Sequence, residues 1–192
     1  MKLKFQKKFT ISFAKKKSNA LHIFMKLILI NGPTGIGKST VSQKIHQAYP
    51  LSFLLDIDAL RRYIGGYREN KDESKQLSLL VSESIVETYL KSGHDVIIDK
   101  VFTDPEIVDR FIELGKKYNA EVHECILNAS RELVIKRAEE RGYRENSLLT
   151  PEKVVRFWEG IQEYIKKRPQ AIIVDVEAMS QEEVYAYIAN TL

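Results

Sequence analysis

The hydrophobic and polar positions of the chain alternate between two kinds of pattern. Short apolar runs of about four to eight residues predict buried strands, and longer stretches with apolar side chains three and four residues apart predict helices. Because these patterns alternate, and parallel strands need crossover connections, the chain is predicted to form an α/β fold with a parallel, doubly wound sheet. The predicted strands are 26–31, 51–55, 95–99, 120–127 and 171–174.

Polar residues that favour helix ends mark where the predicted helices begin. Asp58 is expected to cap a short helix that Gly65-Gly66 ends. Asp72 begins the longest predicted helix, which runs to about Ser92. Its amphipathic face is predicted to carry Leu77, Leu80, Val81, Ser84, Ile85 and Thr88. Further helix starts are predicted at Asp104-Pro105, Ser130, Thr150-Pro151 and Ser180, where Glu183 completes a capping box.

Charge separates residues 1–24 from the rest of the chain. The net charge is +4, yet these 24 residues hold seven lysines and no acidic residue. Of the 30 basic residues, 23 therefore lie in residues 25–192 against 26 acidic ones, a net charge of −3. We expect a basic, dispensable extension or upstream translation start before a mildly acidic domain, with a membrane-surface segment or a transit peptide as alternatives.

Cysteine content and hydropathy limit the compartments in which the protein can work. With Cys125 as its one cysteine, the chain cannot form an internal disulfide, which favours a reducing, cytoplasmic location. No apolar run approaches the roughly 18 residues of a membrane span. We therefore expect no membrane partner, and the sequence does not predict the oligomeric state.

One stretch carries a motif with a specific chemistry. Residues 32–39 read GPTGIGKS, match the phosphate-binding loop or Walker A motif, and lie between a predicted strand and a predicted helix. Glycines let such a loop curl round a phosphate, and its N–H groups and the helix N-terminus attract the anion. Lys38 would reach the β- and γ-phosphates of ATP, and the Ser39 hydroxyl would coordinate Mg²⁺. The predicted nucleotide-binding residues of this loop are Gly32, Thr34, Gly35, Ile36, Gly37, Lys38, Ser39 and Thr40.

Three aspartates are predicted at the same edge of the sheet as this loop. Asp56 and Asp58 follow the second strand, and Asp99, preceded by Val-Ile-Ile, ends the third in a Walker B pattern. Asp99 and Ser39 would hold Mg²⁺. Asp56 and Asp58 could share the remaining work, one orienting the waters of Mg²⁺ and one accepting a proton from an acceptor hydroxyl. The plainer alternatives are a helix cap for Asp58 and a strand-end residue for Asp99.

Three arginines are candidates to cover a phosphate during its transfer. Arg137 and Arg141 lie four residues apart on a predicted helix, and Arg144 follows in a polar segment. We predict that this segment, at about residues 142–150, is a lid, because transfer to a hydroxyl must exclude water as a competing acceptor. The alternative for the first two arginines is an exposed helix face that pairs with neighbouring glutamates.

Residues 25–192 resemble the P-loop kinases of the nucleoside monophosphate kinase-like group. Within it they are most similar to the small kinases that include shikimate and gluconate kinases, chloramphenicol phosphotransferase, zeta toxins and the kinase domain of polynucleotide kinase. Asp56-Ile-Asp58 is similar to the Asp-x-Asp of shikimate kinase, and Asp58-Ala-Leu-Arg61 to the Asp-x-x-Arg of polynucleotide kinase. The resemblance implies that Asp58 is the base and that Arg61 is a cation on the acceptor or phosphate side.

The same resemblance implies a three-layer P-loop NTPase fold with the strand order 2-3-1-4-5. It also implies that one of Arg137 and Arg141 flanks the adenine while the other contacts phosphate. The chain departs from the group after the third strand. Asp99 is followed by Lys100-Val-Phe-Thr, where nucleoside monophosphate kinases carry Gly-Phe-Pro-Arg, and the Gly-Gly-Gly of shikimate kinases is missing. Lys100 could meet an anionic acceptor or pair with an acid.

These features together predict an ATP- and Mg²⁺-dependent phosphotransferase. The acceptor would be a hydroxyl of a small molecule or of a nucleic-acid end. A nucleoside monophosphate kinase, whose acceptor is a phosphate that needs no base, is the alternative, followed by a regulatory protein that binds ATP without transferring phosphate. A GTPase-like switch is disfavoured because the Asp-x-x-Gly motif is missing at Asp99.

Overall fold

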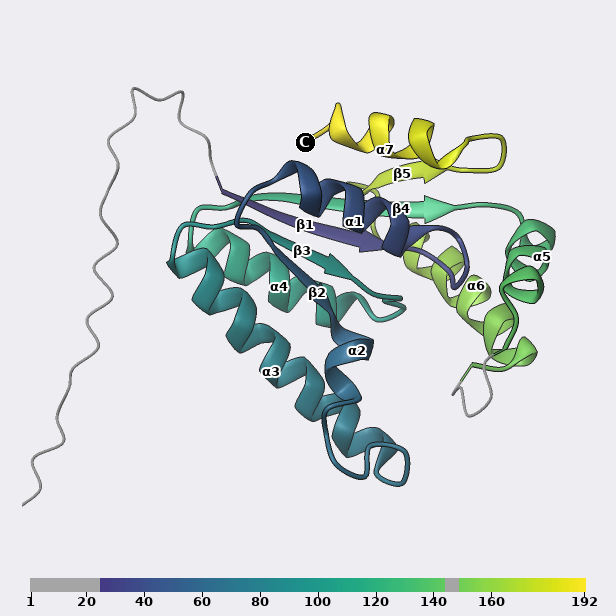
Figure 1. Cartoon of the computed structure of the whole chain (residues 1–192), viewed down its shortest axis with the longest axis horizontal. Helices are drawn as coiled ribbons and strands as arrows, with labels where there is room; N and C mark the ends of the chain where they lie inside the picture. Colours follow the sequence, from purple (N-terminus) through teal and green to yellow (C-terminus); the bar gives the residue numbers. More distant parts are fainter. Residues whose placement is uncertain (1–24, 144–148) are drawn as a thin grey trace, which may run out of the picture.

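Among the described residues, five parallel strands form the central sheet, in the order β2-β3-β1-β4-β5 (Figure 1). The structure is a computed structural model that describes residues 25–143 and 149–192. The strands are β1 (Lys26–Asn31), β2 (Phe53–Asp56), β3 (Val96–Asp99), β4 (Glu121–Asn128) and β5 (Ile172–Asp175). The predicted fold class and strand order are therefore confirmed.

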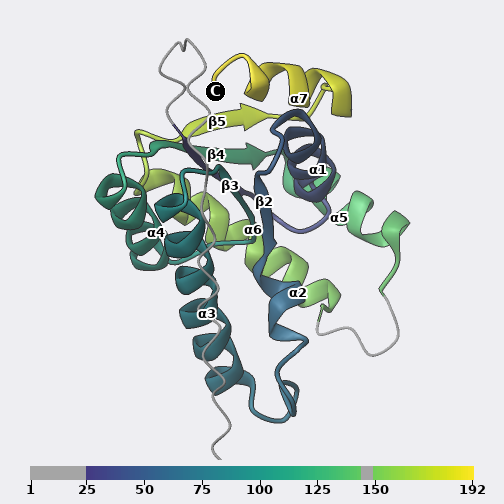
Figure 2. The same cartoon turned by 60° about the vertical axis from the view of Figure 1, so that its left-hand side comes forward.

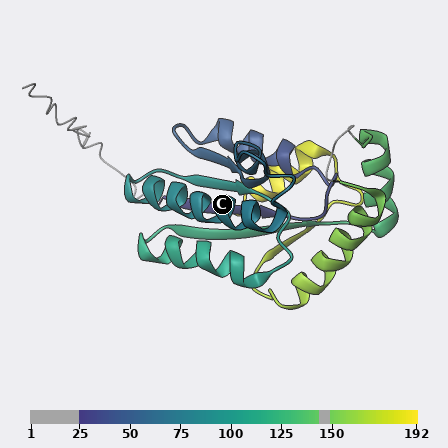
Figure 3. The ribbon, with the colours of Figure 1, turned by 90° about the horizontal axis from the view of Figure 1, so that it is seen from below.

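Helices cover both faces of this sheet, as Figure 3 shows from below. Helices α1 and α7 pack on one face, and α3, α4 and α6 pack on the other. No helix within the described ranges is long and apolar enough to cross a membrane. The helices are α1 (Lys38–Ala48), α2 (Ile57–Arg61), α3 (Lys71–Lys91), α4 (Pro105–Lys117), α5 (Arg131–Arg141), α6 (Pro151–Lys166) and α7 (Gln181–Ala189).

Strand β1 shows why the central strands read as continuous apolar runs. Ile28 and Ile30 face the core beneath α1 and α7, whereas Leu27 and Leu29 face the core beneath α3 and α4. A strand buried on both faces needs apolar side chains at successive positions. The parallel register then brings the carboxyl ends of the strands to one edge, where Asp99 is paired with Ile30 on one side and with Asp56 on the other.

Helix α3 buries a different face from the one predicted, so that prediction was wrong. Leu77, Leu80 and Val81 are exposed, and the first half of the helix extends past the carboxyl edge of the sheet (Figure 2). The buried face is lined in part by serines whose hydroxyls are satisfied within the helix: Ser82 Oγ donates to the Ser78 carbonyl at 2.6 Å. The buried residues of α3 are Ser74, Ser78, Leu79, Ser82, Val86 and Leu90.

Most predicted helix caps are confirmed, but α2 is capped by Asp56 and not by Asp58. The Asp56 carboxylate accepts the Ala59 N–H at 2.8 Å, because β2 ends at Asp56 and the helix begins at the next residue. Asp58 lies one position inside the helix and has no capping bond, so its carboxylate is left for other partners. The predicted caps Asp104, Ser130, Thr150 and Ser180, with the capping box at Ser180 and Glu183, are present.

Candidate nucleotide-binding site

The loop between β1 and α1 has the backbone that a phosphate nest requires. Gly32, Gly35 and Gly37 have φ values of 141°, 83° and 109°, a region that residues with side chains rarely adopt. A Cβ on Gly32 would lie 2.5 Å from the carbonyl oxygen of Leu127. Gly37 precedes α1, and no described side chain caps the N–H groups that this helix start presents. The loop therefore offers unpaired donors and the positive end of a helix to an anion.

Lys38 is held over this loop as a buried cation. The residue is 8% exposed, and its Nζ donates to the Pro33 carbonyl at 2.9 Å. Burial lowers the pKa of Lys38 from 10.5 to about 8, while the charges of Asp99 and Asp58 raise that pKa and those of Arg141 and Lys100 lower it. These interactions place Lys38 among the predicted carboxylates and one predicted arginine. A phosphate beside Nζ would add negative charge next to the buried ammonium and favour its protonated form.

Asp99 and Ser39 form the oxygen-rich corner in which Mg²⁺ was predicted. Burial raises the pKa of Asp99, and Lys38 and a hydrogen bond from Ser39 lower it, while Asp56 and Asp58 raise it further. Carboxylate and hydroxyl oxygens suit Mg²⁺, which usually takes one or two protein ligands together with phosphate oxygens and water. In the described part of the chain, no three His, Cys, Asp or Glu residues are grouped to hold a metal ion by themselves. The donor set thus fits an ion that arrives with a nucleotide.

Asp58 lies beside these groups and is paired with Lys100. The Lys100 Nζ is 2.5 Å from Asp58 Oδ1. The Asp58 side chain is 60% exposed, whereas that of Lys100 is 12% exposed. Of the two alternatives that the sequence left open for Lys100, the structure shows the pairing with an acid. The Asp58 carboxylate is therefore the more accessible partner of this ion pair.

Arg61 contacts the segment that joins α2 to α3. Its Nε donates to Ser74 Oγ at 3.0 Å, and its Nη2 donates to the Lys71 carbonyl at 2.6 Å. A longer contact of 3.4 Å joins Nη2 to the Tyr67 carbonyl. In this structure the guanidinium therefore stabilises the start of α3, and its role toward an acceptor or phosphate stays a prediction.

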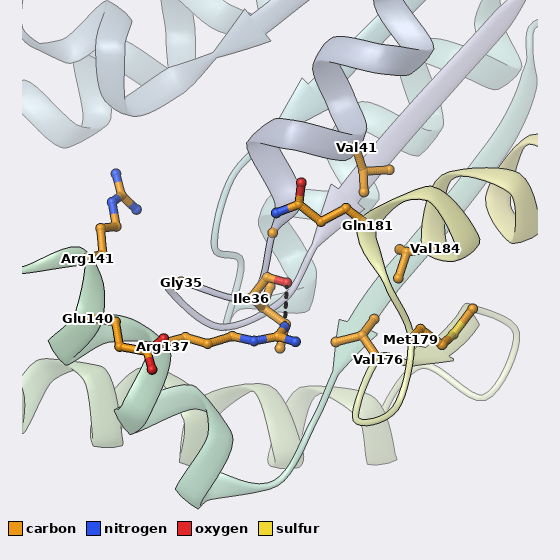
Figure 4. A pocket seen from close by; sticks show the side chains of 11 residues that line it. Gly35, Ile36, Val41, Arg137, Glu140, Arg141, Val176, Met179, Gln181 and Val184 are labelled. Carbon is orange, nitrogen blue, oxygen red and sulfur yellow. Dashed lines mark hydrogen bonds between the residues drawn. The ribbon is translucent and has the colours of Figure 1, made fainter.

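A pocket of about 410 Å³ adjoins the phosphate loop on the side of α5 and α7. Arg137 extends along the loop and its Nη1 donates to the Ile36 carbonyl at 3.4 Å, whereas Arg141 points in another direction (Figure 4). The pocket combines apolar side chains and arginines, as a nucleobase site requires. Its lining is Gly35, Ile36, Gly37, Val41, Arg137, Glu140, Arg141, Val176, Met179, Gln181 and Val184.

Sequence reasoning missed the contribution that the β5–α7 segment makes to this pocket. Val176 and Met179 come from the residues between β5 and α7, Gln181 begins α7, and all three line the pocket together with Arg137 (Figure 4). They follow the carboxyl end of a strand, so the rule that placed the aspartates at this edge would also have indicated them. The predicted arginine Arg144, most of the predicted lid and residues 1–24 lie outside the described residues.

A second missed residue is Asn31, which connects the phosphate loop to the segment after β3. Its Oδ1 accepts the N–H groups of Gly32 at 2.7 Å and Phe102 at 2.8 Å. Its Nδ2 donates to the Phe102 carbonyl at 3.0 Å. The signal in the sequence was a polar residue at the end of an otherwise apolar strand, directly before the first loop glycine. Asn31 positions both loops without being exposed to a ligand.

Comparisons with known proteins identify the family and the fold class of this chain. The fold is that of P-loop kinases, in agreement with the predicted resemblance. Residues 27–163 match the AAA domain family, and because this match covers most of the chain, the chain belongs to that family. A sequence search of curated proteins finds no match.

Solved structures with the same fold include proteins of different biological roles. A gluconokinase from Sinorhizobium meliloti 1021 superposes with a TM-score of 0.63 at 19% identity, over 88% of this chain and 95% of the other. The tunicamycin resistance protein of Deinococcus radiodurans gives a TM-score of 0.60 at 16% identity, over 86% and 94%. A chain of the Pnkp1/Rnl/Hen1 RNA repair complex gives a TM-score of 0.63 at 19% identity, over 78% of this chain and 48% of that one. At these identities the similarity shows the fold alone.

Proposed function

We propose that the protein is an ATP- and Mg²⁺-dependent kinase that transfers the γ-phosphate to a hydroxyl group. The observation that supports this is that Lys38, Asp99 and Asp58 lie close enough together for both carboxylate charges to raise the pKa of Lys38. A phosphate loop with Asp99 alone would suit any nucleotide-binding protein. The exposed carboxylate of Asp58 adds the base that transfer to a hydroxyl requires.

Different residues around the phosphate loop would bind the different parts of a nucleotide. The pocket beside Arg137 would take the base of ATP, and the N–H groups of the loop would bind the phosphates with Lys38. Ser39 and Asp99 would hold Mg²⁺, which neutralises phosphate charge when it is bound. Asp56 is paired in register with Asp99 and would orient waters of that ion.

Asp58 would act as the general base. It would accept the proton of the acceptor hydroxyl while that oxygen forms its bond to the γ-phosphorus and the bond from phosphorus to the ADP oxygen breaks. One oxygen of each aspartate is engaged, by the Ala59 N–H in Asp56 and by Lys100 in Asp58. Asp56 would be the less suitable base because it lies in register with Asp99 and would serve the ion there. Arg141, whose charge reaches Lys38, would stabilise the transferring phosphate, and Arg144 would do so from the predicted lid.

The solved structures with the same fold indicate only a range of candidate acceptors. One neighbour is named as a gluconokinase and another belongs to an RNA repair complex. A sugar acid, another small alcohol or a nucleic-acid end with a free hydroxyl are therefore the acceptors to test. Asp58 serves each of them in the same way, because its task is defined by the hydroxyl and not by the rest of the molecule.

The test is an acceptor screen with γ-labelled ATP, Mg²⁺ and the full chain. The panel covers sugars and sugar acids, nucleosides, nucleotides, aminoglycosides and 5′-hydroxyl oligonucleotides. Lys38→Ala should abolish labelling of every acceptor, and Asp58→Asn should reduce transfer to a hydroxyl by about 10²- to 10⁴-fold. Asp72→Asn, an exposed aspartate at the start of α3, is the matched control and should transfer normally.

Two results would contradict the proposal. ATP binding with slow hydrolysis and no labelled acceptor would indicate a regulatory ATP-binding protein. Labelling of a nucleotide phosphate that survives Asp58→Asn would indicate a nucleoside monophosphate kinase, whose acceptor needs no base.

A further inference from the structure

The two side chains of the ion pair between Asp58 and Lys100 differ in solvent exposure in an unusual way. The lysine is the more buried partner, at 12% exposed against 60% for the aspartate. A lysine side chain is usually more exposed than this, and a nearby negative charge stabilises an ammonium that is partly removed from water. In this structure that charge is the Asp58 carboxylate, 2.5 Å away.

The backbone that carries Lys100 is fixed on both sides. The Lys100 N–H points to the Ile30 carbonyl at 3.4 Å, and both polar backbone groups of Phe102 are bonded to Asn31. Thr103 packs so closely on α6 that a Cβ on Gly160 would lie 2.7 Å from its Cγ2. The fold thus fixes the backbone from which the Lys100 side chain reaches Asp58.

Phosphoryl transfer would change the charge on both sides of this ammonium. When Asp58 takes the acceptor proton it becomes neutral, and Lys100 loses its counter-charge. At the same moment the acceptor oxygen, which must lie about 2.6–3.2 Å from Asp58, gains a phosphoryl group with two negative charges. That group would therefore form within reach of the Lys100 ammonium, which also lies near enough to Lys38 for the two charges to interact.

The geometry points to Lys100 as a further catalytic residue, which pairs with Asp58 before transfer and with the phosphoryl group after it. This inference rests on the proposed kinase function. Lys100 stays protonated throughout and forms no covalent bond, so the proton of the acceptor ends on Asp58 and the phosphoryl group ends on the acceptor. The alternative is that Lys100 only holds α2 in place through Asp58.

Inorganic phosphate, titrated onto the MgADP complex of the full chain, is the probe for this role. We compare the wild type with Lys100→Met, Lys100→Arg and the control Lys117→Met by calorimetry and thermal unfolding. Lys117 pairs with Glu87 at 2.6 Å at the far end of α4, so the control removes a more exposed lysine–carboxylate pair away from the site. Lys100→Met should bind MgADP normally and phosphate about 10- to 100-fold more weakly, because a charge-assisted hydrogen bond is lost. Lys100→Arg should recover most of the loss, and Lys117→Met should match the wild type.

Equal phosphate affinity in the wild type and Lys100→Met would overturn the role of Lys100, and so would a wild-type complex that binds no phosphate. A Lys100→Met protein that loses MgADP binding and melts earlier, with no recovery in Lys100→Arg, would assign Lys100 to structure alone and overturn it as well. Failure of the wild type to bind MgADP would instead contradict the proposed function itself, so the two failures are distinguishable.

Discussion

The lowered pKa of Lys38 should make the affinity of the site for nucleotide phosphates depend on pH. In the free protein, burial lowers this pKa to about 8. A bound diphosphate would favour the protonated ammonium and raise the pKa again. The protein then binds nucleotide best when Lys38 is already protonated, and above pH 8 binding has to take up a proton.

The size of this effect follows from the pKa of the free protein. With a pKa of about 8, roughly nine-tenths of Lys38 is protonated at pH 7 and about one-tenth at pH 9. If the complex remains protonated over this range, the Kd for ADP should rise about tenfold between pH 7 and pH 9. Proton uptake should be about 0.5 per ADP at pH 8.

Calorimetric titration of ADP in EDTA measures both quantities without a metal ion. The Kd comes from titrations at pH 7, 8 and 9, and proton uptake comes from buffers that differ in ionisation enthalpy. Lys44→Met is the matched control, because Lys44 lies on the same helix and pairs with Glu182 on α7. It should keep the tenfold slope. A Kd that is the same at pH 7 and pH 9, or no proton uptake at pH 8, would refute the assignment of a partly deprotonated Lys38.

Three further predictions concern the core and the support of the site. Burial raises the pKa of Cys125 to about 12, so a thiol reagent at pH 8 should label it only after unfolding; rapid labelling of the native protein would contradict its buried position. Leu79→Ala should lower the free energy of unfolding in urea by about 2–5 kcal/mol and Leu80→Ala by about 0.5 kcal/mol or less, and equal costs would contradict the observed face of α3. Asn31→Ala should lower that free energy by about 1–3 kcal/mol, because buried backbone groups of Phe102 lose their partner, and an unchanged urea midpoint would argue against this connection.

The features that the sequence predicted correctly are those encoded within a short stretch of chain. The phosphate loop needs its glycines and Lys38 at fixed spacing, and the continuous apolar run of β1 indicates a strand covered on both faces. Together with the alternation of strands and helices, these local signals were enough for the fold class and for placing the aspartates at one edge. The strand order came from the resemblance to P-loop kinases, because no local pattern encodes it.

The errors arise where hydrophobicity does not report burial. Helix α3 buries Ser78 and Ser82 because their hydroxyls find acceptors within the helix, so burial leaves no unsatisfied polar group. Leu80 is 55% exposed although the adjacent Leu79 is buried in the core, because the two side chains lie on different faces of the helix. Counting apolar residues on a helical wheel cannot detect a buried face that carries serines, because the wheel assigns polar residues to the exposed side.

Contacts between distant segments were beyond the reach of sequence patterns for a related reason. Asp58 and Lys100 are 42 residues apart, and Asn31 and Phe102 are 71 apart. A local pattern can mark one member of such a pair, as it does for Asn31, but not its partner, because the two meet only where β2, β3 and β1 are adjacent in register. The alternatives for Lys100 could therefore be stated from the sequence but not decided.

The position of Asn31 also indicates how the donor side and the acceptor side of the proposed site are held at a fixed distance from each other. One buried amide holds the first N–H of the phosphate loop and both backbone groups of Phe102, two residues after Lys100. The loop that would hold the donor phosphates and the segment that would meet the transferred phosphoryl group are thereby fixed to the same strand end. In-line transfer tolerates little error in the distance between donor and acceptor. A displacement of either segment would strain the bonds to Asn31, so this residue should support phosphate binding and transfer together although it touches neither substrate.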